Sequence, residues 1–371
     1  MRGRIVDMNE AGKTGESVLI AMSGGVDSAV AALLVKEAGF RAVGLTMKNY
    51  CYGDVDVPDR SCCSVEAIHD ARRECDRLGI PHRVVDVEDF FTHEVVDNFL
   101  SEYQEARTPN PCVRCNSIVR FSTLIDYADR FGIDYVATGH YARIFEMDNG
   151  ERYLARSTNR RKDQSYFLSG VHGETLGRML FPLGDYDKET VRDVASDASI
   201  AVADKKESQE VCFVPDGTLR SFLDSKDVAL LAGPIENTGG EVLGRHEGLA
   251  SYTVGQRRHL GIAAGRPQYV VRLDRERNTL VVGDEDELMS GEFTCTFQWL
   301  DPRVRSKPLD VRAQIRYHHE ATPVTDIITD GRKGRVQFES PQRAVCPGQT
   351  VVLFRDDIVV GSGVIDAAGP A

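Results

Sequence analysis

The stretch SGGVDS, Ser23 to Ser28, constrains the fold of this chain more than any other feature. An apolar run, SVLIAM (17–22), leads into it, and AVAALLVKEAG follows it with helical periodicity and a terminal glycine. This order predicts a strand, a glycine loop and a helix. Small residues let backbone N–H groups approach a phosphate closely, and a helix N-terminus adds partial positive charge. A phosphorylated ligand is therefore expected at this loop.

No lysine follows the two glycines, which excludes the GxxxxGK loop of kinase-like nucleotide hydrolases. The stretch resembles instead the pyrophosphate loop of enzymes that split ATP to AMP and pyrophosphate while they adenylate a carbonyl oxygen. This resemblance implies that Asp27 helps to hold Mg²⁺ or the loop, and that the hydroxyls of Ser23 and Ser28 meet phosphate. The alternative is a plain strand–helix turn.

The pattern of strand followed by helix continues beyond the loop. Further strands are predicted at 41–47, 82–87 and 134–140, and further helices at 65–79, 118–132 and 187–199. Strands that alternate with helices imply a parallel, doubly wound sheet. The N-terminal part, residues 1–215, is therefore predicted to be an α/β catalytic domain.

After residue 215 the chain becomes rich in glycine and turn residues. QYVVRLDRERNTLVVGD resembles a hairpin with Glu276, Arg277 and Asn278 near its turn. The final eighty or so residues carry five short alternating runs with little helix, which predicts a small β-barrel or sandwich. We expect a small central β-rich domain over 216–284 and a C-terminal β-barrel over 285–371.

The composition is that of a globular chain with 42% hydrophobic residues and a net charge of −12. This charge argues against a protein that coats nucleic acid indiscriminately, although residues 303–343 hold nine Lys and Arg against five Asp and Glu. No run of eighteen apolar residues and no apolar signal core is present, so we expect a cytoplasmic protein without a membrane span.

Nine cysteines are too few and too unevenly spread for a disulfide scaffold. Two of them, Cys112 and Cys115, lie three residues apart in NPCVRCN. Such a pair can bind zinc, shuttle electrons, ligate an iron–sulfur cluster or attack a substrate. A structural zinc site usually has four ligands, and no second CxxC occurs. Cys62 and Cys63 are interpreted as structural or incidental, with the alternative that they line the approach to the active site. Cys51, Cys75, Cys295 and Cys346 are interpreted as small hydrophobes.

Six further segments decide among the adenylating families. They are TMKNY (46–50), TPNPCVRCN (108–116), ATGHYAR (137–143), KDQSYFL (162–168), SQEVCF (208–213) and SYTVGQRRHLGI (251–262). With the loop, they resemble the tRNA-specific 2-thiouridylases over nearly the whole chain and in the family's order. The resemblance implies that ATP contacts Ala21, Met22, Ser23, Gly24, Gly25, Val26, Asp27, Ser28, Met47 and Gly139.

The resemblance also implies that the central domain over 216–284 binds tRNA, and it implies residues elsewhere that contact tRNA. Asn110, Pro111 and Cys112 would line the pocket of the target base, and the other contacts would be His140, Lys162, Asp163, Gln164, Arg316, Tyr317 and Gln349. The basic run around Lys162 suits backbone phosphates. The alternatives are a core histidine at 140, a solvated charge run at 160–162 and a core tyrosine at 317.

Two cysteines would do the sulfur chemistry. The resemblance implies that Cys212 carries a persulfide and that Cys115 is the partner nucleophile. The carbonyl oxygen at C2 of uridine is a poor leaving group, so ATP first converts it to an adenylate. Persulfide sulfur then attacks C2, and the second thiol breaks the remaining S–S bond, which leaves a disulfide. The implied product is 2-thiouridine at the wobble position of certain tRNAs.

Cys112 departs from the family's most familiar pattern, which has aspartate at this position. In related thiolases three cysteines ligate a [4Fe–4S] cluster, and Cys112, Cys115 and Cys212 supply three such ligands. Cluster-assisted transfer is therefore an alternative to the persulfide relay.

Two rival functions remain open from the sequence. A small-molecule adenylating synthetase would use the same loop without Cys115 or Cys212, and a non-catalytic tRNA-binding or iron–sulfur protein would carry a vestigial loop. For the thiouridylase we expect ATP and Mg²⁺ as cofactors. We expect tRNA and a persulfide donor protein, or a cysteine desulfurase relay, as partners, and a monomer as the active form.

Overall fold

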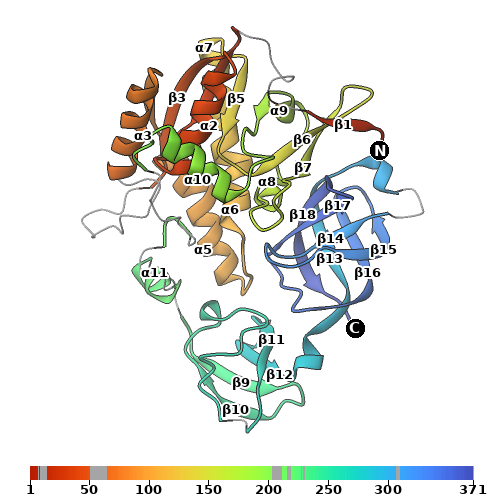
Figure 1. The fold of residues 1–371 in the computed structure, drawn as a ribbon. Helices are drawn as coiled ribbons and strands as arrows, with labels where there is room; N and C mark the ends of the chain where they lie inside the picture. The colour runs from red at the N-terminus through yellow and green to blue at the C-terminus, as the bar shows by residue number, and fades with distance from the viewer. Residues whose placement is uncertain are drawn as a thin grey trace. The chain divides into compact units, whose positions relative to one another are not determined.

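The computed structural model describes residues 1–6, 8, 15–50, 65–202, 211–214, 219–226, 228, 230–263, 265–305 and 310–370 (Figure 1). The chain divides into two compact units. Unit 1 comprises Met1–Val95, Cys112–Gly217 and Asp357–Val359, and unit 2 comprises Val96–Pro111, Thr218–Asp356 and Val360–Ala371. Cys51, which was interpreted as a small hydrophobe, and Cys62 and Cys63, which were interpreted as structural or incidental, lie outside the described residues.

Unit 1 is built on a five-stranded sheet in which all neighbouring strands are parallel. The order across the sheet is β4 (His82–Asp86), β3 (Arg41–Lys48), β2 (Ser17–Ala21), β5 (Tyr135–Thr138) and β8 (Met179–Leu180). The predicted parallel sheet is thereby confirmed. From β2 the chain builds outward to β3 and β4, and it then returns to the other side of β2 with β5. Ligands bind beyond the carboxyl ends of strands at such a switch point.

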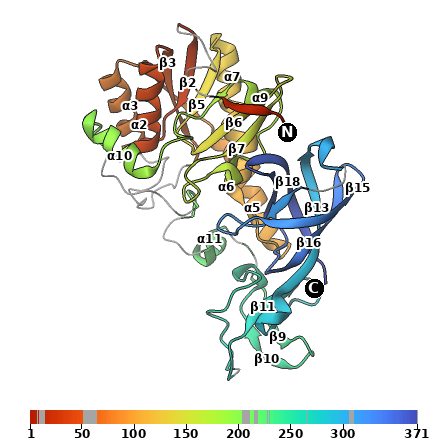
Figure 2. The ribbon, with the colours of Figure 1, turned by 45° about the vertical axis from the view of Figure 1, so that its right-hand side comes forward.

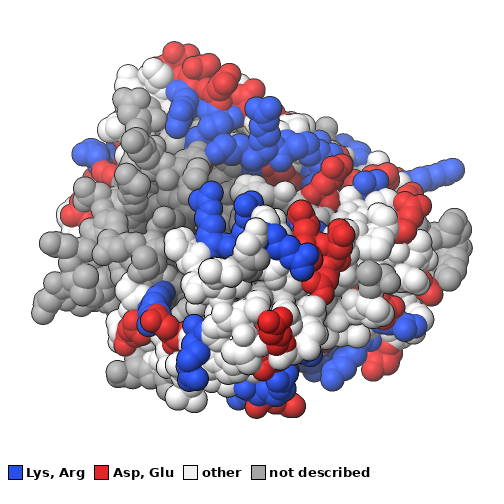
Figure 3. Space-filling view, turned by 90° about the horizontal axis from the view of Figure 1, so that it is seen from below, with Lys and Arg blue, Asp and Glu red and all other residues white. Residues whose placement is uncertain are grey.

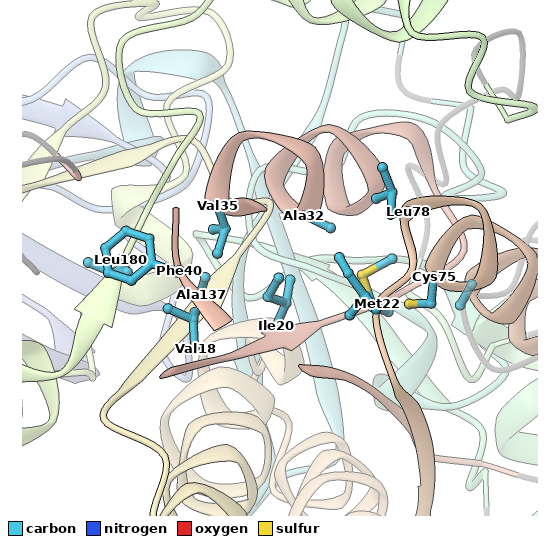
Figure 4. Packing of buried hydrophobic residues seen from close by; sticks show 12 residues of the cluster. Val18, Ile20, Met22, Ala32, Val35, Phe40, Cys75, Leu78, Ala137 and Leu180 are labelled. Atoms are coloured by element: carbon cyan, nitrogen blue, oxygen red, sulfur yellow. The ribbon is translucent and has the colours of Figure 1, made fainter. Parts of the chain in front are cut away.

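Helices cover both faces of this sheet, with α2, α3 and α10 on one face and α7 on the other (Figures 1 and 2). Their bounds are α2 (Val26–Glu37), α3 (Val65–Leu78), α7 (Phe121–Phe131) and α10 (Lys188–Asp197). Figure 4 shows the core that α2 and α3 form on the sheet, with Val35, Leu78 and Ile20 among its members. Because α2 is packed between α3, α10 and the sheet, most of its residues are buried.

Shorter elements complete unit 1. Helical segments are α4 (Glu88–Phe91), a π-helical turn η1 (Thr92–Val96), α6 (Pro111–Arg114), a second π-helical turn η2 (Cys115–Arg120), α8 (Ser165–Leu168) and α9 (Glu174–Gly177). Strands β1 (Gly3–Val6), β6 (Ala142–Met147) and β7 (Arg152–Arg156) pair antiparallel, and Ala155 of β7 also pairs with Ile358. The sequence patterns did not predict these strands.

Unit 2 contains two β-structures. A four-stranded sheet has the order β10 (Val242–His246), β9 (Gly233–Asn237), β12 (Thr279–Gly283) and β11 (Tyr269–Asp274). It includes the predicted hairpin, whose turn holds Asn278 at a φ of 47°. Helical segments here are α5 (Asp97–Gln104), α11 (Leu219–Ser225), η4 (Leu249–Ser251), η5 (Glu285–Leu288) and η6 (Pro302–Arg305).

The C-terminal strands form a closed six-stranded barrel, because β17 pairs with β18 in addition to the ladder β18–β13–β16–β15–β14–β17. The strands are β13 (Met289–Leu300), β14 (Arg312–Gln314), β15 (Thr322–Thr329), β16 (Lys333–Arg343), β17 (Thr350–Arg355) and β18 (Ile358–Ala368). The predicted barrel is confirmed, but the expected five strands omitted β13. Its alternation is clear in hindsight, because Phe293, Cys295 and Phe297 are buried in turn.

Residues Val96–Pro111 belong to unit 2 although they precede the cysteine pair in the chain. The rings of Phe99 and Phe222 meet edge to face with centroids 6.1 Å apart. The Thr108 N–H donates to the Pro347 carbonyl at 2.9 Å. Gly348, at a φ of 90°, lies so near that a Cβ would stand 2.8 Å from the Thr108 nitrogen. The segment that leads into NPCVRCN is therefore held by the barrel.

The surface combines both signs of charge. Figure 3 shows one face on which Lys and Arg gather in several groups among Asp and Glu side chains. A net charge of −12 is thus compatible with local positive potential. Among the described residues no helix has the length and apolar character needed to cross a membrane.

Acidification is expected to destabilise unit 2 through His246. Its Nδ1 accepts a hydrogen bond from the Gly248 N–H at 3.1 Å, and its Nε2–H donates to the Asn278 carbonyl at 3.0 Å. Burial, the largest cause, lowers the pKa of His246 below that of an unfolded histidine. Because the unfolded chain then binds the proton more readily, this stabilisation is complete above about pH 6.5 and is lost as the pH falls below it.

Urea unfolding followed by the fluorescence of Trp299, the single tryptophan, reports on the barrel of unit 2. Between pH 7.5 and pH 5.5, wild type should lose about 1 kcal/mol more stability than the His246→Gln variant, which cannot titrate. Equal losses in the two proteins would contradict this role of His246.

Candidate active site

The glycine loop lies at the switch point of the parallel sheet. It follows β2 and precedes α2, and Gly25 adopts an extended backbone (φ −104°, ψ 163°) just before the helix without a side chain to cap it. Met22 ties the loop entry to β3, because its N–H donates to the Leu45 carbonyl at 2.9 Å. The N-terminus of this 12-residue helix therefore receives no side-chain cap from Gly25, and such a terminus suits an anionic ligand.

The two serines of the loop, Ser23 and Ser28, are hydrogen-bonded to each other. The Ser28 hydroxyl donates to the Gly25 carbonyl at 2.9 Å and accepts from the Ser23 N–H at 3.2 Å, and the two hydroxyl oxygens are 3.2 Å apart. Gly24 adopts a φ of 70° and lies against the backbone of Ala67, where a side chain would not fit. These contacts set the loop in its curved form before any ligand binds.

Two other predicted nucleotide contacts lie at the same edge of the sheet. Gly139 follows β5, and a Cβ there would stand 2.7 Å from the Asp27 carbonyl carbon and 2.8 Å from the Ser28 nitrogen. Met47 lies near the carboxyl end of β3 and is almost wholly buried. Its neighbour Thr46 donates to the Met22 carbonyl at 2.9 Å. The structure thus brings together residues that are distant in the sequence.

Asp27 is the charged residue of the glycine loop. Its Oδ1 accepts from the Tyr141 hydroxyl at 2.7 Å and from Lys188 Nζ at 2.7 Å. The Tyr141 residue is 2% exposed and the Lys188 side chain 11%. Lys188 therefore brings a cation to the glycine loop, which itself contains none.

Sequence reasoning missed Lys188 and Tyr141. One signal was present for the lysine, because it is the first residue of α10, directly after the N-cap Asp187. The positive end of the helix dipole disfavours a cation there, so a lysine at this position requires a nearby anion. Tyr141 is part of the quoted segment ATGHYAR but carried no role in the prediction.

The first cysteine of the pair, Cys112, lies in the helical segment α6. Cys112 is exposed, whereas Cys115 is 8% exposed and is the first residue of the π-helical turn η2. Turns of this kind are rare and occur often at functional sites. The two thiols therefore differ in access to solvent, although they are only three residues apart.

Cys212 is half-buried and lies beside a cluster of aromatic rings. Its neighbour Phe213 is 1% exposed and meets the ring of Phe91 edge to face, with centroids 5.7 Å apart. Phe91 ends α4, and η2, which starts at Cys115, packs on the same short helix. The two chain segments that carry Cys115 and Cys212 are thus both attached to α4.

The other described thiols differ from this pair. Cys75, Cys295 and Cys346 are buried, and burial raises the pKa of Cys75 and of Cys295 to about 12. Such thiols stay protonated and unreactive at neutral pH. Their interpretation as small hydrophobes is confirmed.

No metal site is assembled from the described cysteines. Within the described residues, which include Cys112, Cys115 and Cys212, no three His, Cys, Asp or Glu side chains converge in a way that could hold a metal ion. The donor set for a [4Fe–4S] cluster is therefore not brought together, and the observed arrangement does not fit that group.

A polar chain connects the cysteine segment to the nucleotide loop. The Asn116 side chain donates to the Phe167 carbonyl at 3.0 Å and accepts from Arg120 at 2.8 Å. The same Arg120 Nη1 lies 3.4 Å from His140 Nε2, and His140 Nδ1 lies 2.8 Å from the Thr138 hydroxyl. Since arginine can only donate, Nε2 must accept, which assigns the proton to Nδ1.

His140 is therefore a neutral residue. Burial of the imidazole and then the charge of Arg120 lower its pKa to about 3. Part of the residue still reaches the surface, so its predicted contact with tRNA would be uncharged. This neutral state means that such a contact would not change with pH in the physiological range.

The predicted tRNA loop at 162–164 is braced by its own side chains. Asp163 is 7% exposed, and its carboxylate accepts from the N–H groups of Ser157 and Ser165 and from the Ser165 hydroxyl. Burial raises the pKa of Asp163, and these hydrogen bonds oppose that rise. Gln164 Oε1 accepts from the Tyr141 N–H at 3.0 Å, while Lys162 is half-buried.

Three predicted tRNA contacts, Arg316, Tyr317 and Gln349, lie in the barrel part of unit 2. Gln349 donates its side-chain amide to the Thr108 carbonyl at 3.1 Å. Arg316 and Tyr317 are half-buried, and their carbonyls accept from the Gln314 amide. The tripeptide Asn110, Pro111 and Cys112 spans the point where the chain passes from unit 2 to unit 1. The roles of all these residues stay predictions.

Comparisons with known proteins cover almost the whole chain. Three family models match, described as tRNA methyl transferase HUP domain over residues 16–216, tRNA methyl transferase PRC-barrel domain over 220–284, and aminomethyltransferase beta-barrel domain over 292–365. The tRNA-specific 2-thiouridylase MnmA of Pelotomaculum thermopropionicum is 43% identical over 95% of this chain and 98% of its own length. The protein of the same name from Geobacter metallireducens is 44% identical, over 96% and 98%.

A solved 4-thiouridine synthetase–RNA complex with bound ATP is also similar. It has a TM-score of 0.34 and 17% identity, over 54% of this chain and 46% of that chain. Similarity at this level carries no argument about function.

Replacing Lys188 should weaken the binding of ATP. We expect Lys188→Met to raise the Kd for ATP about tenfold, equivalent to about 1.4 kcal/mol, because the site loses its buried cation. Isothermal titration calorimetry of the full chain measures this effect. Lys333→Met, at an exposed position in the barrel, is the matched control and should bind ATP like wild type. Equal affinities of Lys188→Met and wild type would contradict the role of Lys188.

Proposed function

We propose that this chain, which belongs to the tRNA-specific 2-thiouridylase family, is an ATP-dependent tRNA sulfurtransferase that converts the wobble uridine to 2-thiouridine. The observation that carries the proposal is the combination, within unit 1, of a pyrophosphate loop with two thiols attached to α4. The domain models bear the name methyltransferase, but the relatives that match the full length are thiouridylases.

Adenylation uses the glycine loop. The uridine O2 attacks the α-phosphorus of ATP, pyrophosphate leaves, and C2 then carries AMP as a leaving group. In this proposal the N-terminus of α2, Lys188 and the serine hydroxyls stabilise the phosphate charge, which the missing side-chain cap of α2 and the buried cation at Lys188 support. Mg²⁺ fits the carboxylate of Asp27, a hard oxygen donor next to the phosphate site, and would neutralise charge on the departing pyrophosphate.

Sulfur transfer uses both cysteines. The terminal sulfur of a persulfide on Cys212 attacks C2, and AMP departs with the oxygen. The Cys115 thiolate then attacks Cys212 Sγ, the bond to the transferred sulfur breaks, and its electron pair completes the thiocarbonyl. The protein is left with a Cys115–Cys212 disulfide, which an external dithiol must reduce before a persulfide donor reloads Cys212.

Positioning of the target base falls to the motif around the cysteine pair. The base must leave its stack in the anticodon loop to reach the adenylation site. Asn110, Pro111 and Cys112 line its pocket in this proposal, and Lys162, Asp163, Gln164, His140, Arg316, Tyr317 and Gln349 contribute to the binding of tRNA. We place the enzyme in the cytoplasm as a monomer, supplied with sulfur by a persulfide donor protein or a cysteine desulfurase relay.

The proposed reaction predicts the behaviour of two serine variants. Cys115→Ser and Cys212→Ser should each lower formation of 2-thiouridine by about 1,000-fold or more, because each removes one thiol of the relay. Both should bind ATP like wild type, since neither thiol is part of the glycine loop. Purified protein is incubated with unmodified tRNA, ATP, Mg²⁺ and a persulfide donor, and the nucleosides are analysed after digestion. A wild type that yields no 2-thiouridine, even after anaerobic reconstitution with iron and sulfide, would overturn the proposal.

The Cys112→Asp variant separates the relay from cluster chemistry. The relay needs only Cys115 and Cys212, so this variant should form 2-thiouridine under air and without iron. Iron content and activity are measured on the same preparation, with Cys115→Ser as the inactive control. Activity of wild type that depends on bound iron and is lost in Cys112→Asp would contradict the relay.

A further inference from the structure

The segment SYTVGQRRHLGI (251–262) has no role in the chemistry described above. It lies in unit 2, between η4 and β11, and exposes three consecutive residues, Arg257, Arg258 and His259. The flanking residues Tyr252 and Leu260 belong to the core of the central sheet. The segment therefore forms a surface loop with both ends anchored.

Hydrogen bonds hold this loop in one shape. The Gly255 N–H donates to the Val270 carbonyl at 2.8 Å, and the Val270 N–H donates to the Gln256 carbonyl at 2.9 Å. The Gln256 side chain accepts from the Thr253 N–H at 3.2 Å and donates to the Arg258 carbonyl at 2.9 Å. Gln256 thus braces the loop from inside, directly beside the two arginines.

The backbone angles of the loop also indicate that it is held in one shape. His259 adopts a φ of 61°, which is uncommon for a residue with a side chain, and Gly255 adopts a φ of 89°. A Cβ on Gly255 would stand 2.8 Å from the Cβ of Ala344. A loop that keeps an unfavourable conformation beside exposed cations is constrained by its surroundings.

The two arginines differ from their neighbours in how their charge is balanced. In the part of the chain that the structure describes, no side chain pairs with the guanidinium of Arg257 or Arg258. Two other exposed arginines of the central domain form ion pairs, Arg266 with Asp284 at 2.9 Å and Arg272 with Asp274 at 3.6 Å. In a chain with a net charge of −12, Arg257 and Arg258 give the braced loop a local positive charge.

We propose that Arg257 and Arg258, with His259, form a contact surface for the sugar–phosphate backbone of tRNA. The proposal rests on the proposed function for the identity of the nucleic acid. A guanidinium presents several N–H donors that match phosphate oxygens, and release of counterions from the nucleic acid favours binding. Because the loop is already ordered, little conformational entropy is lost when a phosphate binds.

The salt dependence of tRNA binding tests this surface. The Kd of the full chain for unmodified tRNA is measured by filter binding over a range of KCl concentrations. The double variant Arg257→Gln/Arg258→Gln should lower the slope of log K against log[salt] by about 2 in magnitude, or about 1 for each arginine that no longer binds a phosphate. Its KM for tRNA should rise while kcat at saturating tRNA stays near that of wild type.

The matched control is Arg266→Gln/Arg272→Gln. It removes the same charge from exposed positions of the same domain, but from arginines that are already paired. It should keep the wild-type slope. If both double variants lower the slope equally, the effect is one of net charge and the proposal is overturned. If the slope of Arg257→Gln/Arg258→Gln equals that of wild type, the loop serves another partner and the proposal is overturned as well.

Two measurements distinguish a loss of phosphate contacts from misfolding of the variant and from a failure of the proposed function. Far-UV circular dichroism reports whether the double variant keeps its fold. If it does not, the two single variants take its place, and each should lower the slope by about 1. Binding is measured without catalysis, so a wild type that binds tRNA but makes no 2-thiouridine would overturn only the proposed function. A wild type that thiolates tRNA, with an unchanged slope in the double variant, would overturn only the loop surface.

Discussion

The close approach of β5 to the first turn of α2 is the constraint on which the rest of unit 1 depends. Gly139 lies where a methyl group would meet the backbone of Asp27 and Ser28. The next two residues, His140 and Tyr141, contact two different parts of unit 1. His140 continues through Arg120 to Asn116, the neighbour of Cys115, and Tyr141 returns to the Asp27 carboxylate. One tripeptide therefore links the glycine loop to the segment that carries Cys115.

Much of the fold followed from patterns that act over short distances. The alternation of strands and helices predicted the parallel sheet, because each element's periodicity depends only on which face it buries. Strands β1, β6 and β7 were missed, since they are short and lie outside that alternation. Strand β13 was missed although it alternates well, because it directly follows the helical turn η5 without a loop between them.

The candidate site was predictable where a motif carried it and not where the fold assembled it. The glycine loop and its companion Gly139 were found because glycine directly after a buried strand is typical of a close approach to a ligand. Lys188 lies 161 residues from Asp27, so the ion pair between them has little local sequence signature. The one local sign is a lysine at the start of a helix, where the helix dipole disfavours a cation. The burial of Asp163 was also hidden, because a charged residue inside a basic run suggests solvent, whereas here it organises the loop.

The attachment of residues Val96–Pro111 to the barrel has a consequence for how such proteins can change over evolutionary time. Thr108 is bound by Pro347 and Gln349, and Arg107 donates to the Ile365 carbonyl, so this segment is fitted to one particular barrel surface. A barrel exchanged between relatives at a boundary near residue 218 would arrive without its matching segment. A functional hybrid must inherit two separated stretches of chain together, which makes the C-terminal barrel a poor candidate for independent shuffling.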